Sequence, residues 1–573
     1  MAEKNKSEFD YPWLENYPSR PNWNMNIKPR LMNDVLDETV GKQPSKPAID
    51  FLGKQTSWAD LQKKICHFAT GLQKLGLNKG DKVGLFLPNC TLYMIAYYGI
   101  LRAGCTVVNF NPLYAHDELV YQIEDSEIDI MVTHDLAMLL DKMDDMLEDT
   151  RLKTLIIGSF AKELPFPKNM LFPVLKGKDI AQIKNSDHHI KLDDFLNNDG
   201  KVSVPEIDLL EDVAVLQYTG GTTGVPKGAM LTHANIFINT AQCHSHFPDP
   251  PPEESGEHEK MLAVLPFFHV FSMTVCLNLA VLARMEIVTL PRFDLNDAMK
   301  LLHNKKPQFM PAVPAIFNAI TAHPKLRSYD VSSLRFCISG GAPLPLVVKK
   351  AFESKTGCTV VEGYGLSESS PVVSVNPTFG ENIAGSIGMP LPDTVIEIID
   401  REDKVTPMPL GERGEVCIRG PQVMKGYYNK PKATENTLRK TKDGDYRLHT
   451  GDIGIMDNKG YIYIVDRIKD LIITNGYNVY PRNIEEAIYK HPNVEECIVA
   501  GLPDSRRGEI VKAWIKLKEG REMNAEELQG FLEDKISRIE MPKKIEFRKE
   551  PLPKTLIGKL SRKDIVAQEL EKI

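Results

Sequence analysis

Residues 218–228 form the segment that most constrains this chain. They include four glycines, four hydroxyl side chains and one lysine, and they follow an apolar run at residues 213–216 that predicts a buried strand. Exposed backbone N–H groups, hydroxyls and the charge of Lys227 together suit the binding of polyphosphate oxygens better than a merely flexible turn. The segment is not a Walker loop, because Pro226 and Gly228 flank Lys227, and it contains no Gly-x-Gly-x-x-Gly fingerprint.

Short β-rich runs alternate with amphipathic helical patterns over most of the sequence. Residues 82–87 predict a buried strand, residues 93–103 the helix after it, and residues 105–110 the next strand. Further strands are predicted at residues 129–133, 154–157 and 286–290. This alternation predicts an α/β fold with largely parallel sheets.

The chain has 573 residues, which is too long for a single hydrophobic core of roughly 250–300 residues. After a strand predicted at residues 460–465, residues 466–470 read as a charged break. Residues 471–573 then look self-contained, with strands predicted at 496–500, 512–517 and 544–547 and a helix at 525–537. We therefore predict two domains, residues 1–468 and 469–573.

Residues 218–228 resemble the phosphate loop of the adenylate-forming superfamily, which comprises acyl-CoA synthetases, peptide synthetase adenylation domains and beetle luciferases. The resemblance extends from about residue 30 to about residue 565. It implies a large N-terminal domain of two βαβ-type subdomains plus a small β-barrel, followed by a small mobile α+β C-terminal domain. It also implies ATP binding by this loop, with Thr223 contributing to catalysis and to Mg²⁺ binding. The loop residues assigned to ATP are Tyr218, Thr219, Gly220, Gly221, Thr222, Thr223, Gly224 and Lys227.

Two further segments match the superfamily in the expected order. The segment containing Gly341, Ala342 and Pro343 resembles the one that lies against adenine. Residues 362–368 resemble the Tyr-Gly-x-Thr-Glu motif, with a serine in place of the threonine that retains the hydroxyl. The resemblance implies that the tyrosine stacks on adenine, the hydroxyl contacts the α-phosphate and the final glutamate holds Mg²⁺. The residues so assigned are Glu362, Gly363, Tyr364, Gly365, Ser367 and Glu368.

The resemblance continues through the end of the predicted N-terminal domain and into the C-terminal one. Asp452, in a Thr-Gly-Asp motif, would accept both ribose hydroxyls, and Arg467 would approach the nucleotide. Lys469 aligns with the hinge between domains. Residues 476–481, which include the cofactor-binding assignments Gly476 and Tyr477, resemble a signature of bacterial long-chain fatty acyl-CoA synthetases.

Lys559 ends a Pro-Lys-Thr-x-x-Gly-Lys motif and would be the catalytic lysine. When a carboxylate attacks the α-phosphate of ATP, two anions meet and charge spreads over the phosphoryl oxygens. A positioned ammonium stabilises that charge, an effect worth about 3–4 kcal/mol in comparable oxyanion sites.

The acid substrate is less strongly marked. His269 lies in a segment that resembles the one at the reacting carboxylate, and residues 309–314 are apolar, which suits an alkyl chain. Residues 13–18 and 109–114 also resemble fatty acyl-CoA synthetases, although the tryptophan usual before Thr-Gly-Asp is missing. The prediction is an AMP-forming acid-thiol ligase that joins a medium- or long-chain fatty acid to coenzyme A through an acyl-adenylate. An aryl-acid ligase, a ligase loading a separate carrier protein and a non-catalytic binder remain as alternatives.

The composition bears on partners and location. A net charge of −7 argues against nucleic acid as the main partner. The nine cysteines are scattered and never spaced Cys-x-x-Cys, which indicates free thiols in a reducing compartment. No signal peptide and no apolar run of about 18 residues is visible. We expect a cytoplasmic protein, and leave open an association with the inner face of a membrane and a homodimer.

Overall fold

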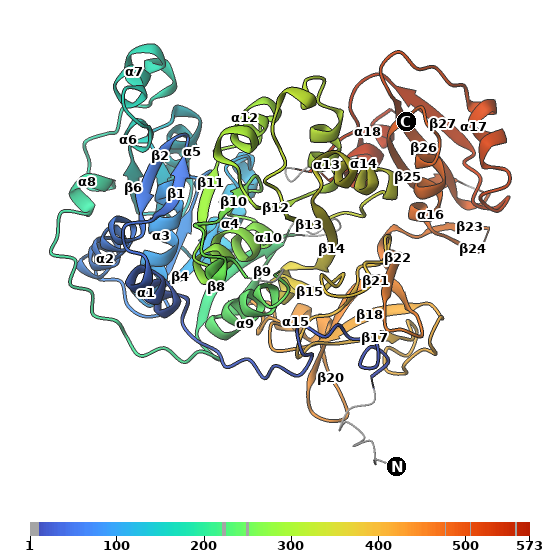
Figure 1. Ribbon diagram of the computed structural model, residues 1–573, viewed down its shortest axis with the longest axis horizontal. Helices are drawn as coiled ribbons and strands as arrows, with labels where there is room; N and C mark the ends of the chain where they lie inside the picture. The colour runs from blue at the N-terminus through green and yellow to red at the C-terminus, as the bar shows by residue number, and fades with distance from the viewer. Residues whose placement is uncertain are drawn as a thin grey trace.

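The computed structural model describes residues 11–219, 225–247, 251–475, 477–504, 506–555 and 559–572. Sheets with helices packed between and around them form most of the molecule, and a smaller C-terminal unit lies at one end (Figure 1). The mixed α/β class predicted from the alternating pattern is confirmed. Within these residues, no helix combines the length and the apolar character needed to cross a bilayer.

The first sheet carries the predicted phosphate loop. Its order is β19-β9-β8-β4-β3-β5-β6-β7; strands β8 to β7 run parallel along this order, and β9 and β19 are antiparallel. All four residues of β4 are buried, as expected for a strand covered on both faces. The bounds are β3 Lys82–Leu85, β4 Thr106–Asn109, β5 Ile130–His134, β6 Thr154–Gly158, β7 His189–Lys191, β8 Val213–Thr219, β9 Lys227–Thr232 and β19 Gly426–Tyr427.

The second sheet has nine strands in the order β16-β15-β14-β13-β12-β10-β11-β1-β2. The pairs from β14 to β1 are parallel, whereas β2, β15 and β16 are antiparallel additions. The bounds are β1 Pro47–Phe51, β2 Lys54–Ser57, β10 Lys260–Ala263, β11 Glu286–Thr289, β12 Phe309–Ala312, β13 Phe336–Ser339, β14 Thr359–Gly365, β15 Val372–Val375 and β16 Met389–Pro390.

The helices supply much of the core around these sheets. Every residue of α3 (Thr91–Arg102) is buried, because it packs against α2 (Trp58–Lys74) and the strands beside it. A π-helix, η3 (Met273–Asn278), lies between α10 and α11. The other helices are α1 Met32–Lys42, α4 His116–Ser126, α5 Ala137–Asp149, α6 Phe160–Glu163, α7 Lys168–Leu175, α8 Leu192–Phe195, α9 His233–His244, α10 Val270–Ser272, α11 Leu279–Leu282, α12 Leu295–Lys305, α13 Pro314–Ala322, α14 Leu346–Thr356 and α15 Pro431–Thr437.

A smaller antiparallel sheet follows along the chain. It consists of β17 Val395–Ile399, β18 Gly414–Arg419, β20 Leu438–Lys440, β21 Tyr446–Met456 and β22 Ile462–Arg467. Residues 466 and 467 belong to β22, so the charged break predicted there was placed too early. Pairing with β21 extends the strand through these two charged residues.

The C-terminal sheet has its own hydrophobic core. It consists of β23 Ile472–Thr474, β24 Tyr477–Val479, β25 Val494–Asp504, β26 Gly508–Leu517 and β27 Lys544–Arg548, with α16 Pro481–Tyr489, α17 Ala525–Leu532 and α18 Arg562–Leu570. The helix predicted over residues 525–537 was too long, because α17 ends at Leu532 and turns follow it. The sheet begins directly after η6 (Ile468–Asp470); the division near Lys469 itself stays a prediction.

Candidate active site

The β8–β9 hairpin carries the predicted phosphate loop. Thr219 and Lys227 are paired at the end of the hairpin that joins the loop. The predicted ligands Gly220, Gly221, Thr222, Thr223 and Gly224 lie outside the described residues, so their assignments stay predictions. The ammonium of Lys227 lies 5.0 Å from the centre of the Tyr427 ring.

The hydroxyl of Tyr218 is engaged elsewhere and does not donate a hydrogen bond toward the phosphate loop. Its side chain is buried, and its hydroxyl donates a 2.8 Å hydrogen bond to the carboxylate of Asp125 on α4. Burial, together with this carboxylate, raises the pKa of the Tyr218 phenol. Any contribution of Tyr218 to nucleotide binding would therefore come from its backbone.

Glu368, the predicted Mg²⁺ ligand, lies in the short helix η5 (Ser367–Ser369). Its carboxylate accepts a 2.6 Å hydrogen bond from the hydroxyl of Tyr427, and its backbone carbonyl accepts one from Met424 N. Tyr427 thus contacts both Lys227 and Glu368. Tyr427 was not predicted from the sequence, because it lies 59 residues from Glu368 and belongs to no recognised motif.

Residues 362–365 form the carboxyl end of strand β14 in the second sheet. The hydroxyl of Tyr364 donates a 2.5 Å hydrogen bond to Asp452. A Cβ atom on Gly365 would lie 2.0 Å from the carbonyl oxygen of Pro371, so only glycine fits there. The Glu362 carboxylate is buried and accepts a hydrogen bond from Gly385 N, and burial raises its pKa. Glu362 therefore supports the segment of residues 362–368 through its hydrogen bond to the backbone of Gly385.

Asp452 and Arg467 face each other across the β21–β22 pair. The guanidinium Nε of Arg467 lies 3.0 Å from Oδ1 of Asp452, while Tyr364 donates to Oδ2. The two residues predicted to approach the nucleotide are therefore in direct contact, and Tyr364 joins them.

Glu415 holds the segment of strand β21 that carries Asp452. One of its carboxylate oxygens accepts a 3.0 Å hydrogen bond from Gly451 N, and the other lies 2.8 Å from Nδ1 of His449. The β18–β21 register is irregular between Glu415 and Cys417, opposite this segment of β21. Glu415 lies 36 residues from Gly451 and was not predicted from the sequence.

Lys559 comes from the C-terminal part of the chain and lies against the loop after β13. A Cβ atom on Gly341 would be 3.0 Å from Cε and 3.6 Å from Nζ of Lys559. Burial, together with the positive charge of Arg467, lowers the pKa of Lys559 to about 8, although Asp452 opposes this shift. The ammonium therefore lies in the electrostatic field of the Asp452–Arg467 pair.

His269 lies at the start of α10. Its Nδ1 accepts a 3.3 Å hydrogen bond from Phe271 N, so the neutral ring carries its proton on Nε2. Burial and the charge of Lys559 lower the pKa of His269 to about 3. The ring is thus a neutral hydrogen-bond donor close to Lys559.

The remaining predicted residues lie in several other segments of the chain. Ser367 precedes Glu368 in η5, and Ala342 and Pro343 follow Gly341. Lys469 is in η6; burial and Arg467 lower its pKa, whereas Asp452 and Glu368 are among the groups that raise it. Tyr477 is 60% exposed in the C-terminal sheet, and Gly476 lies outside the described residues.

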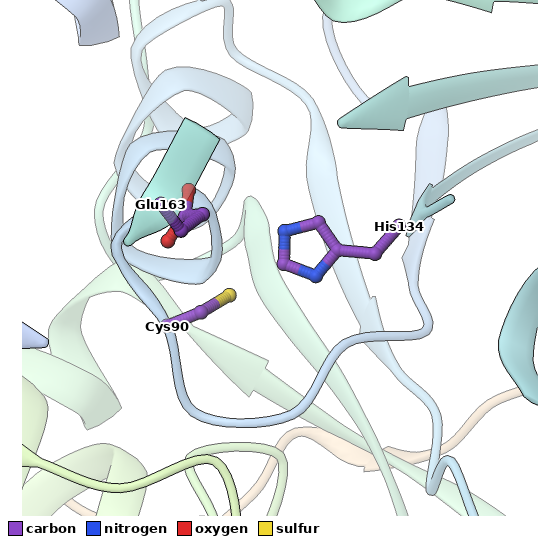
Figure 2. Close-up of side chains that lie close together, drawn as sticks. All are labelled: Cys90, His134 and Glu163. Carbon is purple, nitrogen blue, oxygen red and sulfur yellow. The ribbon is translucent and has the colours of Figure 1, made fainter. Parts of the chain in front are cut away.

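Another group of ligating side chains lies at the end of strand β5, where Cys90, His134 and Glu163 converge (Figure 2). The carboxylate of Glu163 accepts hydrogen bonds from Thr91 N and Leu92 N, and Cys90 Sγ accepts one from Tyr93 N. Two of the three side chains therefore cap α3. Burial lowers the pKa of His134 to about 3, which keeps its ring neutral.

The residue before α3's cap links this region to the active site. Asn89 donates a 2.8 Å hydrogen bond to Leu265 O and accepts one of 2.6 Å from Phe267 N. These contacts hold the segment that leads to His269. The capped start of α3 thus helps to position a predicted catalytic residue.

The comparisons with known proteins agree with this geometry. The family described as AMP-binding enzyme matches residues 36–428, and the AMP-binding enzyme C-terminal domain matches residues 483–559. A long-chain-fatty-acid–CoA ligase of Bacillus subtilis (strain 168) is 42% identical over 98% of both chains. A protein of the same name from Escherichia coli O157:H7 is 37% identical, over 96% of this chain and 97% of its own.

Among solved structures, ATP-bound MatB from Rhodopseudomonas palustris superposes with a TM-score of 0.80. The sequences are 27% identical, and the match covers 94% of this chain and 99% of that one. The family model covers more than half of the chain, and the curated relatives match it over nearly its whole length. The chain belongs to the family of AMP-binding enzymes.

Proposed function

We propose that this protein is an ATP-dependent acyl-CoA ligase that joins a fatty acid to coenzyme A through an acyl-adenylate, releasing AMP and pyrophosphate. The observation that carries the proposal is the convergence of Lys559, His269 and the Asp452–Arg467 pair beside Gly341. The names of the two bacterial relatives, which describe long-chain-fatty-acid–CoA ligases, support the fatty acid as substrate.

In the first step, the fatty acid carboxylate attacks the α-phosphate of ATP and pyrophosphate leaves. Lys559, with a pKa of about 8, is mostly protonated at pH 7 and offsets the charge that develops on the phosphoryl oxygens. The Nε2–H of His269 is free of the bond to Phe271 and would orient the carboxylate. Asp452 would receive the ribose hydroxyls, with Tyr364 against the adenine.

The half-buried carboxylate of Glu368 suits Mg²⁺, since a hard cation prefers carboxylate oxygen and the Tyr427 hydroxyl orients this one. When bound, Mg²⁺ would neutralise phosphate charge. Thr223 is proposed as a second ligand. Lys227 and the other loop residues, Thr219 to Gly224, would bind the β- and γ-phosphates.

In the second step, the coenzyme A thiol displaces AMP from the acyl-adenylate. In the present arrangement Lys559 lies beside Gly341 and close to His269. We propose that the domain of residues 469–573 rotates about Lys469 and carries Lys559 away. Tyr477, exposed on that domain, would then approach the site from its new position.

The proposal also includes a membrane and a second copy of the chain as partners. The protein would associate with the inner face of a membrane, where long-chain fatty acids partition, and it would form a homodimer. An aryl acid as substrate and the loading of a separate carrier protein are the competing activities.

The test is pyrophosphate release from the purified protein with palmitate and ATP, with and without coenzyme A. The proposal predicts one enzyme-equivalent of pyrophosphate without coenzyme A and sustained turnover with it. The variant Lys559→Ala should lose the first step yet form thioester from synthetic acyl-AMP. Turnover with an aryl acid but not with palmitate would favour the first competitor, and no pyrophosphate with any acid would overturn the ligase assignment.

A further inference from the structure

Helix α7 (Lys168–Leu175) and the residue pair before it carry large apolar side chains on the outside of the protein. None of the residues of α7 is buried. Phe166, Met170, Leu171, Val174 and Leu175, which we call the α7 surface, are between 48% and 78% exposed. Single exposed apolar side chains are common, but five of them within ten residues form a patch that marks an interaction site.

The α7 surface is one side of an anchored helix. Phe172, on the other side, packs against the core, with its ring centre 5.2 Å from that of Phe160 in α6. Positions 170, 171, 174 and 175 are spaced i, i+1, i+4 and i+5 and therefore share one face of the helix. Figure 1 shows α7 at the periphery, on the side of the molecule opposite the C-terminal sheet. The helix is thus held in a fixed orientation with its apolar face outward.

Lysines surround this apolar face. Lys162, Lys168, Lys176 and Lys178 are all exposed, and Lys54 lies beside them, since its ammonium donates to the carbonyl of Lys162. The one acidic residue between 160 and 178 is Glu163, whose carboxylate is turned inward to cap α3. Lys162 and Lys176 have acidic partners, Asp193 and Asp179, whereas Lys168 and Lys178 form no ion pair with any residue the structure describes.

We propose that the α7 surface docks this protein onto an anionic phospholipid membrane. Its apolar side chains would enter the boundary between headgroups and acyl chains, and the lysines around them would contact anionic headgroups. This inference rests on the proposed function, since it gives the ligase direct access to fatty acid dissolved in the bilayer. It goes beyond that function by naming the surface that binds the membrane and the type of lipid that this surface contacts.

The charge distribution favours a membrane over a second copy of this chain. A symmetric dimer formed through α7 would bring the lysine rims of two copies together, and like charges that face each other weaken an interface. An anionic bilayer supplies the opposite charge and an apolar layer at once. The face is also only two turns long, which fits shallow insertion.

The experiment is flotation of the full-length protein with vesicles of phosphatidylcholine alone and of phosphatidylcholine mixed with phosphatidylglycerol. We expect binding to the mixed vesicles that weakens as salt is raised. Val174→Asp should reduce the bound fraction by about tenfold, since a charge on the lipid-facing side is disfavoured in the bilayer. The matched control is Leu210→Asp, which places the same charge at an exposed leucine outside the α7 surface and should bind like the wild type.

A second pair of measurements separates this inference from the proposed function. Acyl-CoA formation from a water-soluble medium-chain acid without vesicles should be the same in Val174→Asp and wild type, because the α7 surface does not contact the site. Equal vesicle binding by Val174→Asp and Leu210→Asp, or no binding by the wild type, would overturn the docking proposal. So would a dimer that Val174→Asp converts to monomer. Absence of acyl-CoA formation in every variant would instead refute the proposed function.

Discussion

Lys559 lies directly against the backbone of Gly341, so that a side chain added there would press on the lysine. A Cβ atom on Gly341 would approach Cε of Lys559 to 3.0 Å, and the φ of Gly341 is +79°. The contact joins the loop after β13 to the C-terminal part of the chain, which are more than 200 residues apart in sequence. It places the ammonium beside the segment predicted to contact adenine.

Gly341→Ala should therefore slow acyl-adenylate formation. The new methyl group would displace Lys559, and we expect a loss of about tenfold or more, given that such a charge is worth about 3–4 kcal/mol. Pyrophosphate release in a single turnover measures the effect. The matched control is Gly357→Ala, where φ is +77° but no atom lies within 4 Å of the added Cβ. It should lose about 1 kcal/mol of stability through backbone strain and keep its activity. Equal loss in both variants would show that strain, and not the contact, is responsible.

The pKa of Lys559 predicts how pyrophosphate release depends on pH. Because the protonated form is the active one, kcat/KM for pyrophosphate release should be constant below the pKa of about 8 and fall as pH rises through it. His269, with a pKa of about 3, stays neutral and should add no step near neutral pH. Lys559→Arg, whose guanidinium remains charged, should retain part of the activity and lose the decline. A decline that persists in this variant would assign the titration to another group.

Tyr427 should govern the Mg²⁺ requirement through Glu368. Glu368→Gln should remove most activity and weaken the dependence on Mg²⁺ concentration. Tyr427→Phe removes only the 2.6 Å hydrogen bond and keeps the ring beside Lys227. We therefore expect the Mg²⁺ affinity to fall by about 10-fold to 100-fold, while kcat stays higher than in Glu368→Gln. The neighbouring Tyr428→Phe is the control, because that hydroxyl contacts Glu127 and Lys82 instead. An Mg²⁺ titration unchanged in Tyr427→Phe would contradict the link.

The proposed hinge can be tested at Lys469. Proline fixes φ near −65° and removes a backbone donor, so Lys469→Pro should trap one domain orientation, while Lys469→Ala should have a mild effect. The present arrangement has Lys559 at Gly341. We therefore expect the proline variant to release pyrophosphate in the first turnover and to lose most thioester formation. Rapid-quench timing of the two half-reactions provides the measurement. An equal slowing of both, or an alanine variant as damaged as the proline variant, would move the hinge elsewhere.

The sequence determined the class of fold and the identity of the local motifs. Alternating apolar runs predicted β3, β4, β5, β6 and β11 to within a few residues, because a buried parallel strand leaves a local pattern of β-branched and apolar residues. Spacing within single segments was also sufficient to predict strand β8 and to recognise the motifs around Tyr364, Asp452 and Lys559.

Only the tertiary structure decided which residues hold these motifs in place. Tyr427 contacts Glu368 from 59 residues away, Glu415 fixes Gly451 from 36, and Asn89 binds Leu265 from 176. No local pattern encodes such contacts, because each depends on how sheets and loops pack after the chain has folded. The same holds for the α7 surface, because only the finished fold shows that its apolar side chains stay exposed among the described residues.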